Sequence, residues 1–199
     1  MRNVSLVLLL LLAVGRQAGA QDSPLLRRWL QAPPNLWADI ENSPSFPTKL
    51  RLHINSRDDN LGGGIGVEDV FLGQSSITLS GGYERESPDR NSYHAHLRYY
   101  VLPLGGYINL APQLGYRSTL NTTGVDVGIQ VVFALSPQSA DLRLAQTFTT
   151  PGTTTELGTT TISASYALDR QLFLHSGIQW RRSPLYSDSL VRLGLEWRL

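Results

Sequence analysis

Cysteine is absent from the 199-residue chain, and its single methionine is Met1. Without cysteine the chain has no disulfide framework, no thiolate nucleophile, no thiolate metal ligand and no acceptor for lipoprotein acylation. Long apolar runs are missing as well, and the mean hydropathy is only −0.13. The longest run, Leu6–Val14, is too short for a transmembrane helix, which needs about 20 residues.

The first 20 residues match a secretory signal peptide instead. Arg2 provides the charged start, the run 6–14 the apolar centre, and Ala18-Gly19-Ala20 the small-residue cleavage site. We expect cleavage after Ala20, with an uncleaved anchor as the alternative. Cleavage removes two arginines and no acid, which leaves 15 basic residues against 16 acidic ones. This balance gives no reason to expect a nucleic-acid partner.

Residues 21–47 show no strand pattern. Apolar residues recur at helical spacing around Trp29 and Trp37, and Pro33, Pro34 and Pro47 interrupt or end these patterns. We predict a short helical or irregular periplasmic segment. It either contacts the barrel or membrane surface, as a lid, plug or interfacial helix, or forms a poorly ordered leader. In either case we expect it to be dispensable for the remainder of the fold.

The stretch 124–135, GVDVGIQVVFAL, alternates strictly. One face carries only apolar residues: Val125, Val127, Ile129, Val131, Phe133 and Leu135. The other face is polar or small, as in a strand with two unlike sides. About nine to eleven tilted residues cross a bilayer as a strand, so this stretch is long enough to do so. It predicts one strand of a transmembrane β-barrel.

Similar alternation recurs from residue 48 to the end of the chain. It predicts an all-β, antiparallel up-and-down barrel of about ten strands. The expected strands are 48–55, 64–72, 75–85, 92–102, 107–117, 124–135, 140–149, 158–167, 171–181 and 189–199. The second is the weakest, because either face of its GVEDVFL sequence turns Glu68 or Asp69 outward. A β-bulge there would remove the conflict.

Connection lengths and aromatic positions add to this pattern. Short connections (73–74, 103–106, 136–139 and 168–170) alternate with longer polar ones (56–63, 86–91, 118–123, 150–157 and 182–188). Outer-membrane barrels have short periplasmic turns and longer external loops. Aromatic residues on the apolar face gather near strand ends and predict two interfacial belts. They are Phe71, Tyr83, Tyr93, Tyr116, Phe133, Phe148, Tyr166, Trp180 and Trp197.

The opposite face is expected to line the lumen. Its candidate residues are Arg51, His53, Glu84, His94, His96, Arg98, Arg117, Asp126, Arg143, His175, Arg192 and Glu196, with Lys49, Asp141, Arg181 and Arg198 in addition. A ten-stranded barrel is narrow enough for side chains to fill it. A packed and charge-paired interior is therefore favoured. A narrow, mildly basic pore for small anions is the alternative.

Enzyme and metal signals are weak. His94 and His96 are two residues apart on one strand and could approach one ion, but no further ligand is close in sequence. Ser92, Asp58 and Asp59 supply residue types for hydrolysis without a diagnostic spacing. We therefore expect no catalysis, no metal and no cofactor.

The final stretch, 189–199, ends in LVRLGLEWRL. It resembles the C-terminal strand of bacterial outer-membrane barrels, which their insertion machinery recognises. Those strands usually end in Phe, and Leu199 departs from that pattern. The segments 38–46 and 66–73 are also similar to uncharacterised secreted barrel proteins of cyanobacteria. These resemblances imply a Gram-negative outer-membrane location after export, with lipid and the insertion machinery as partners and a monomeric state.

The sequence thus predicts a signal peptide (1–20), a periplasmic segment (21–47) and an outer-membrane barrel (48–199). The expected role is structural, or interaction through external loops. The alternatives are the narrow anion pore and a soluble lipocalin-like lipid binder, whose apolar face would point inward.

Overall fold

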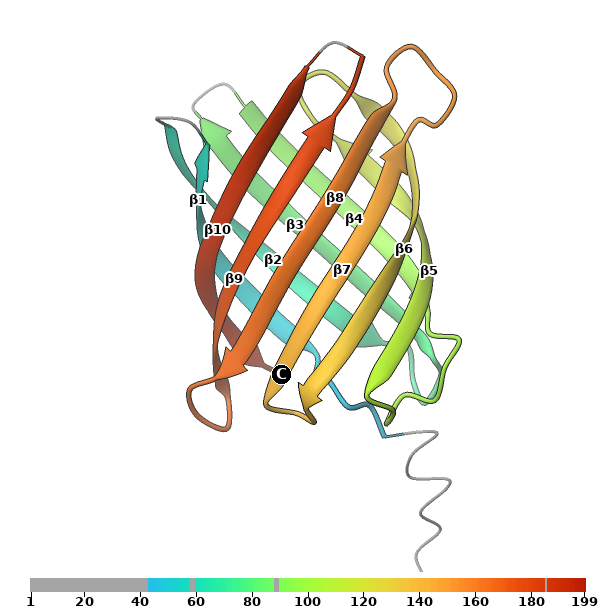
Figure 1. Ribbon diagram of the computed structural model, residues 1–199, viewed down its shortest axis with the longest axis vertical. Coiled ribbons are helices and arrows are strands. Elements are labelled where there is room, and N and C mark those ends of the chain that lie inside the picture. Colours follow the sequence, from blue (N-terminus) through green and yellow to red (C-terminus); the bar gives the residue numbers. More distant parts are fainter. Residues whose placement is uncertain (1–42, 58–59, 88–89, 185) are drawn as a thin grey trace, which may run out of the picture. The chain divides into compact units, whose positions relative to one another are not determined.

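The computed structural model describes residues 43–57, 60–87, 90–184 and 186–199, and these form one closed barrel (Figure 1). Its ten strands are β1 (Lys49–Arg57), β2 (Asn60–Phe71), β3 (Ile77–Ser87), β4 (Arg90–Tyr99), β5 (Ile108–Ser118), β6 (Thr123–Ser136), β7 (Ala140–Thr149), β8 (Leu157–Ala167), β9 (Leu172–Arg182) and β10 (Ser187–Arg198). Each strand pairs antiparallel with its sequence neighbours, and β1 pairs with β10 to close the ring. The predicted antiparallel barrel of about ten strands is confirmed.

The apolar face of the strands lies outside. In β6, Ile129 is 44% exposed and its neighbour Gln130 only 3% exposed. Each charged side chain on the outer surface of the described barrel lies within three residues of a strand end, so the middle of that surface carries no charge. This is the arrangement that lipid requires, and it is the reverse of a lipocalin, whose apolar face encloses a ligand. The apolar face therefore points outward, as predicted, and the lipocalin-like alternative with an inward apolar face does not fit the structure.

A β-bulge in β2 resolves the conflict between Glu68 and Asp69. The pairing of β2 with β3 shifts register between Val67 and Val70. Asp69 occupies the left-handed region with a φ of 53°, a conformation that aspartate adopts more readily than most residues. The extra residue turns both carboxylates inward, and Asp69 is completely buried.

The connections differ from the predicted short and long pattern. We call the barrel end that holds Thr48 and Leu199 the proximal end, and the opposite end the distal end. The distal connections are 58–59, 88–89, 119–122, 150–156 and 183–186; the proximal ones are 72–76, 100–107, 137–139 and 168–171. The prediction of long loops at 56–63 and 86–91 is wrong, because strands β1 to β4 include most of those residues. The longest connection, 100–107, is proximal.

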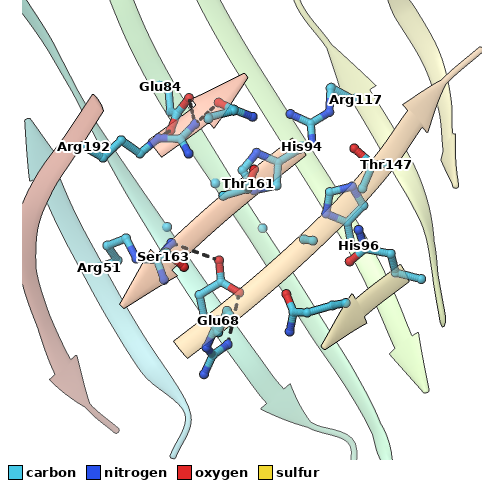
Figure 2. A pocket seen from close by; sticks show the side chains of 18 of the residues that line it. Arg51, Glu68, Glu84, His94, His96, Arg117, Thr147, Thr161, Ser163 and Arg192 are labelled. Atoms are coloured by element: carbon cyan, nitrogen blue, oxygen red, sulfur yellow. Dashed lines mark hydrogen bonds and ion pairs between the residues drawn. The ribbon is translucent and has the colours of Figure 1, made fainter. Parts of the chain in front are cut away.

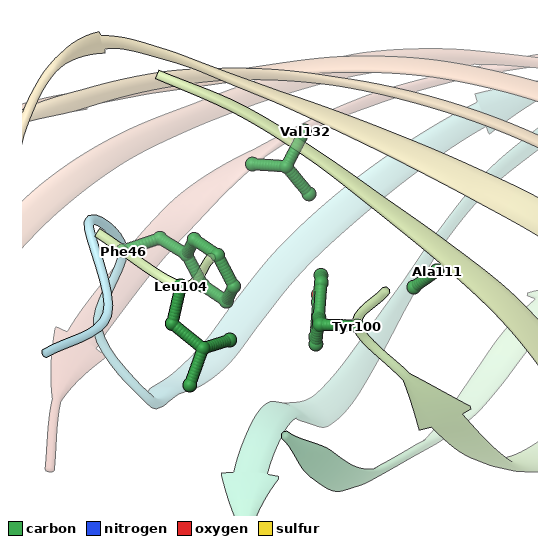
Figure 3. Close-up of a cluster of buried hydrophobic side chains, with 5 residues drawn as sticks. All are labelled: Phe46, Tyr100, Leu104, Ala111 and Val132. Carbon is green, nitrogen blue, oxygen red and sulfur yellow. The ribbon is translucent and has the colours of Figure 1, made fainter. Parts of the chain in front are cut away.

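Residues 43–47 lie against the proximal end. The Ser45 amide donates to the Leu104 carbonyl over 2.8 Å, and the Gln138 amide donates to the Ser45 carbonyl over 2.7 Å. Phe46 is buried beside Tyr100, with their ring centroids 4.9 Å apart (Figure 3). The apolar cluster in the described barrel comprises Phe46, Tyr100, Leu104, Ala111 and Val132, with Phe71 packed against it.

This cluster places a small apolar layer across the proximal end of an otherwise polar lumen. Residues 43–47 make the contacts described above, and the dispensability of the segment 21–47 stays a prediction. The predicted signal peptide (1–20) and the predicted helical part of residues 21–47 lie outside the described residues. No helix in the described ranges is long and apolar enough to cross a membrane.

Candidate functional site

Sixteen charged side chains face the lumen, each at most 15% exposed and each within an ion pair. The cations are Lys49, Arg51, Arg57, Arg98, Arg117, Arg143, Arg181 and Arg192. The anions are Glu68, Asp69, Glu84, Glu86, Asp126, Asp141, Asp188 and Glu196. Eight positive charges therefore face eight negative ones. The basic excess expected from sequence is absent from the described lumen, and Arg198 is exposed at the end of β10.

Eight of these side chains form a closed ring near the proximal end, in which positive and negative charges alternate. In order, the ring runs Lys49, Asp141, Arg143, Asp69, Arg98, Glu68, Arg51 and Glu196, and returns to Lys49. Neighbouring nitrogen and oxygen atoms lie 2.6–3.3 Å apart. We call this set the proximal ring. Because each charge has two opposite neighbours, none is buried uncompensated.

Asp69 joins the two sides of the barrel within this ring. Its carboxylate accepts from Arg143 of β7 over 2.6 Å and from Arg98 of β4 over 3.1 Å. It also accepts from the hydroxyls of Tyr100, over 2.9 Å, and Thr78, over 3.1 Å. Strands β2 and β7 are five places apart in the ring of ten, so the Asp69–Arg143 pair crosses the lumen.

The ring also meets the apolar cluster. The guanidinium carbon of Arg143 lies 5.5 Å from the centre of the Phe46 ring, within cation–π range. Lys49 Nζ lies 4.5 Å from the Phe173 ring in the same way. Phe46 therefore covers the proximal ring from the proximal end of the barrel.

A smaller ring of alternating charge lies near the distal end. Arg57 pairs with Glu86 at 3.2 Å and with Asp188 at 2.6 Å. Arg181 pairs with Asp188 at 2.8 Å and also bonds to Glu86, which closes the circle. We call these four residues the distal ring. It links β1, β3, β9 and β10.

Between the two rings, two separate arginine–carboxylate pairs each include a histidine. Glu84 contacts Arg192 Nε at 2.6 Å and His53 Nε2 at 3.0 Å. Asp126 contacts Arg117 Nε at 3.0 Å and His96 Nε2 at 2.6 Å.

The two remaining histidines differ from these. His175 Nδ1 lies 3.3 Å from Glu196 Oε1. His94 stacks on His96 with the ring centroids 5.2 Å apart, and its ring has no hydrogen-bond partner in the described ranges. No group of three or more metal-binding side chains occurs in the described part of the chain.

Glycine residues make room for the imidazole rings of His53 and His96. A Cβ at Gly115 would lie 2.5 Å from the His96 ring and 2.0 Å from the Ala95 carbonyl oxygen. A Cβ at Gly64 would lie 2.7 Å from the His53 ring. The small residues on inward positions of one strand thus accept the large side chains of the next, as close packing requires.

A chamber of about 80 Å³ lies between the two rings (Figure 2). Five arginines line it, together with the acids Glu68 and Glu84 and three of the histidines: His53, His94 and His96. Glycines of β2 and β3 and short hydroxyl side chains of β7 and β8, such as Thr147 and Thr161, supply the space.

The residues expected in the aromatic belts lie on the outer wall to different extents. Tyr166 is 64% exposed and Tyr93 51%, while Tyr83, Tyr116, Phe148, Trp180 and Trp197 are 40–44% exposed. Phe71 and Phe133 are only partly exposed, and Phe71 turns toward the proximal cluster with its ring centroid 5.9 Å from that of Phe46.

Comparison with known proteins places the chain by fold. No protein-family model and no curated protein matches it. Two solved structures of the KdgM porin, one of them in complex with disordered oligogalacturonate, superpose with TM-scores of 0.51 and 0.50. They share 8% and 9% identity, and each match covers 76% of this chain and 99% of the porin.

The fold is that of a porin-like outer-membrane β-barrel. The NanC porin has a TM-score of 0.49 at 8% identity, over 76% of this chain and 100% of that one. At such identities the likeness concerns the fold alone. The resemblance of 38–46 and 66–73 to cyanobacterial barrels stays a prediction.

Sequence reasoning assigned no lumen role to Glu68, Asp69, Arg57, Glu86 and Asp188, all of which are ring members. Glu68 and Asp69 carried a signal, because a strand with acids on both faces cannot lie in a lipid-facing wall without a bulge. The other three were assigned to or beside long loops. Their strands extend further than the alternation indicated.

Proposed function

We propose that the protein is a structural barrel of the outer membrane whose lumen is closed by its own side chains. The observation that carries this proposal is the proximal ring, in which eight charges from five strands pair in a continuous circle. Removing one member of a buried pair costs about 3–5 kcal/mol. A solute that must displace several such pairs meets a large barrier.

The two other layers support the same function. The distal ring crosses the opposite end, and Phe46 with its cluster covers the proximal ring from outside. A water-filled channel would leave its charged side chains hydrated, whereas none of the sixteen is more than 15% exposed. Adhesion through external loops has less support, because the distal connections contain only two to seven residues.

A non-catalytic role agrees with the way in which Ser165, His175 and Glu196 contact one another in the lumen. Ser165 donates to Glu196 over 2.7 Å, and His175 lies beside the same carboxylate. An activated serine nucleophile would need its hydroxyl hydrogen-bonded to the histidine, and the other ring nitrogen of that histidine hydrogen-bonded to the carboxylate. Outer-membrane lipid and the insertion machinery, through 189–199, are the partners of this proposal; nucleic acid and a second subunit have no part in it.

Location and export belong to the proposal as well. The apolar outer wall supports a place in lipid, and the outer membrane follows from the fold together with the signal-peptide pattern. If this is correct, protein from the outer-membrane fraction begins at Gln21 when its mass is measured. A mass that includes residues 1–20 would contradict export with cleavage.

Conductance in planar bilayers tests the closed lumen. The purified protein should show no stable open level in moderate salt. Replacing two charge-balanced pairs by serine, Asp69 with Arg143 and Glu86 with Arg181, should produce a measurable conductance. Serine at the exposed Asp169 and Arg170 is the matched control and should change nothing.

The alternative, a narrow pore for small anions, rests on the chamber between the rings. It predicts steady conductance and anion preference in the unmodified protein. That result would overturn the structural proposal.

A further inference from the structure

The chamber between the two rings presents guanidinium groups whose hydrogen-bond donors are not all used. Arg117 donates from Nε to Asp126, and its two Nη atoms have no acceptor among the described residues. Arg192 donates from Nη2 to Glu84 and Gln179; its Nε lies in ion-pair contact with Glu84 without a hydrogen bond, and its Nη1 has no acceptor among the described residues. Arg143 Nη2 is fully buried and also lacks a partner.

The wall around these donors is locally basic, although the lumen as a whole is neutral. Five arginines line the chamber, but only two of the eight lumen carboxylates do. Asp69, Asp126 and Glu196 are completely buried behind their partners and do not reach it. An occupant therefore meets the cationic side of several ion pairs.

Neutral polar groups complete the wall. His53 Nδ1, His96 Nδ1 and Thr147 Oγ1 are buried without a hydrogen-bond partner, and all three residues line the chamber. In Figure 2 the guanidinium groups of Arg117 and Arg192 lie on either side of the His94 ring. Buried polar groups without partners are uncommon, and several around one cavity indicate a missing polar occupant.

We propose that this chamber binds one small oxyanion, of the size of phosphate or sulfate, between Arg117, Arg192 and His94. A chamber of about 80 Å³ has room for several waters or for one such ion. Planar guanidinium groups with free N–H edges match oxyanions in geometry as well as charge. The site does not depend on whether the lumen conducts.

Retention of labelled phosphate tests the site. The full mature chain is refolded into detergent micelles with radiolabelled phosphate and then dialysed. Refolding is used because paired side chains lie on both sides of the chamber. About one phosphate per barrel should remain, and sulfate should compete for it, whereas chloride at equal ionic strength should not.

Two variants and one control locate the bound ion. Arg117→Lys keeps the charge opposite Asp126 but loses the forked donors, and it should weaken retention about tenfold or more. His94→Gln should weaken it as well; the His94 side chain makes no hydrogen bond to a described residue, so this variant remains informative if Arg117→Lys fails to fold. Arg182→Lys, exposed at the distal end of β9, should retain phosphate like the unmodified protein.

Two results would overturn the proposal. If the unmodified barrel retains no phosphate, the chamber contains only water. If Arg182→Lys loses phosphate while His94→Gln keeps it, the ion binds at the outer surface.

Discussion

At the residue scale, Asp69 connects the side chains of the lumen to the backbone of the bulge. Its carboxylate bonds to Arg98, Arg143 and Tyr100, and its backbone adopts a strained left-handed conformation. Such a conformation costs about 1–3 kcal/mol and persists only where the surroundings determine it. The contacts of the inward carboxylate provide that compensation, so the bulge and the proximal ring depend on each other.

Asp69→Asn removes the negative charge and leaves the backbone conformation unchanged, because asparagine also tolerates the left-handed region. The variant leaves Arg98 and Arg143 short of a negative partner. We expect a loss of about 3–5 kcal/mol in the free energy of unfolding, measured by urea titration of the barrel in lipid vesicles. Asp169→Asn, in an exposed proximal turn, should change it by less than about 0.5 kcal/mol. Equal effects of the two variants would show that the ring is not a source of stability.

At the scale of elements, the segment before β1 belongs with the barrel. Residues 43–47 add hydrogen bonds to the 100–107 and 137–139 connections and place Phe46 over the proximal ring. Pro44 and Pro47 hold this short piece away from strand pairing, since proline provides no amide donor. The piece behaves as a lid rather than an eleventh strand.

Shortening the chain tests this lid. A mature chain that begins at Ser43 should fold like the full one, whereas one that begins at Thr48 should lose stability. Phe46→Ala alone should cost about 3–5 kcal/mol, as for other buried phenylalanines. Heat-modifiable migration on gels and urea titration measure both effects. Unchanged stability of the chain that begins at Thr48 would support the prediction that residues 21–47 are dispensable and contradict a lid role for residues 43–47.

At the scale of the whole molecule, the barrel reverses the usual layout of a soluble protein. Its outer wall is apolar, its interior is ionic, and the charges of the described lumen cancel. Antiparallel pairing around a closed ring leaves no free sheet edge, which is what lipid demands of strands. The ion pairs then provide the internal contacts that a hydrophobic core provides elsewhere.

Insertion into lipid tests this layout. Ile129→Arg places a charge on the outer wall near the middle of β6 and should cost about 2–4 kcal/mol. Thr123→Arg, on the same strand at its distal end, should cost about 0–1 kcal/mol near the interface. Folding yield into vesicles, followed by tryptophan fluorescence, compares the two. If Thr123→Arg is as damaging as Ile129→Arg, position 129 does not face the bilayer centre.

The sequence by itself determined the strands and their faces. A period of two is a local property. The odd-numbered residues from Val125 to Leu135 could therefore be assigned to the outer face, and Asp126 and Gln130 to the inner face, without knowledge of any partner strand. Closure followed from the same pattern, because a wall that is apolar on one side along its whole length must avoid free edges. Only the strand ends, most clearly at 56–63, were misplaced, since hairpin pairing continues beyond the alternating residues.

Tertiary structure alone decided which charges meet. Asp69 and Arg143 are 74 positions apart, and Arg181 and Glu86 are 95 apart. Their contact depends on barrel tilt, register and the bulge, which no local pattern encodes. The insertion of Phe46 has the same origin: its burial requires the 100–107 connection to be in place. The period-two pattern and the composition of each strand determine which of its faces is apolar. The ion pairs across the lumen are determined by the closure of the sheet in three dimensions.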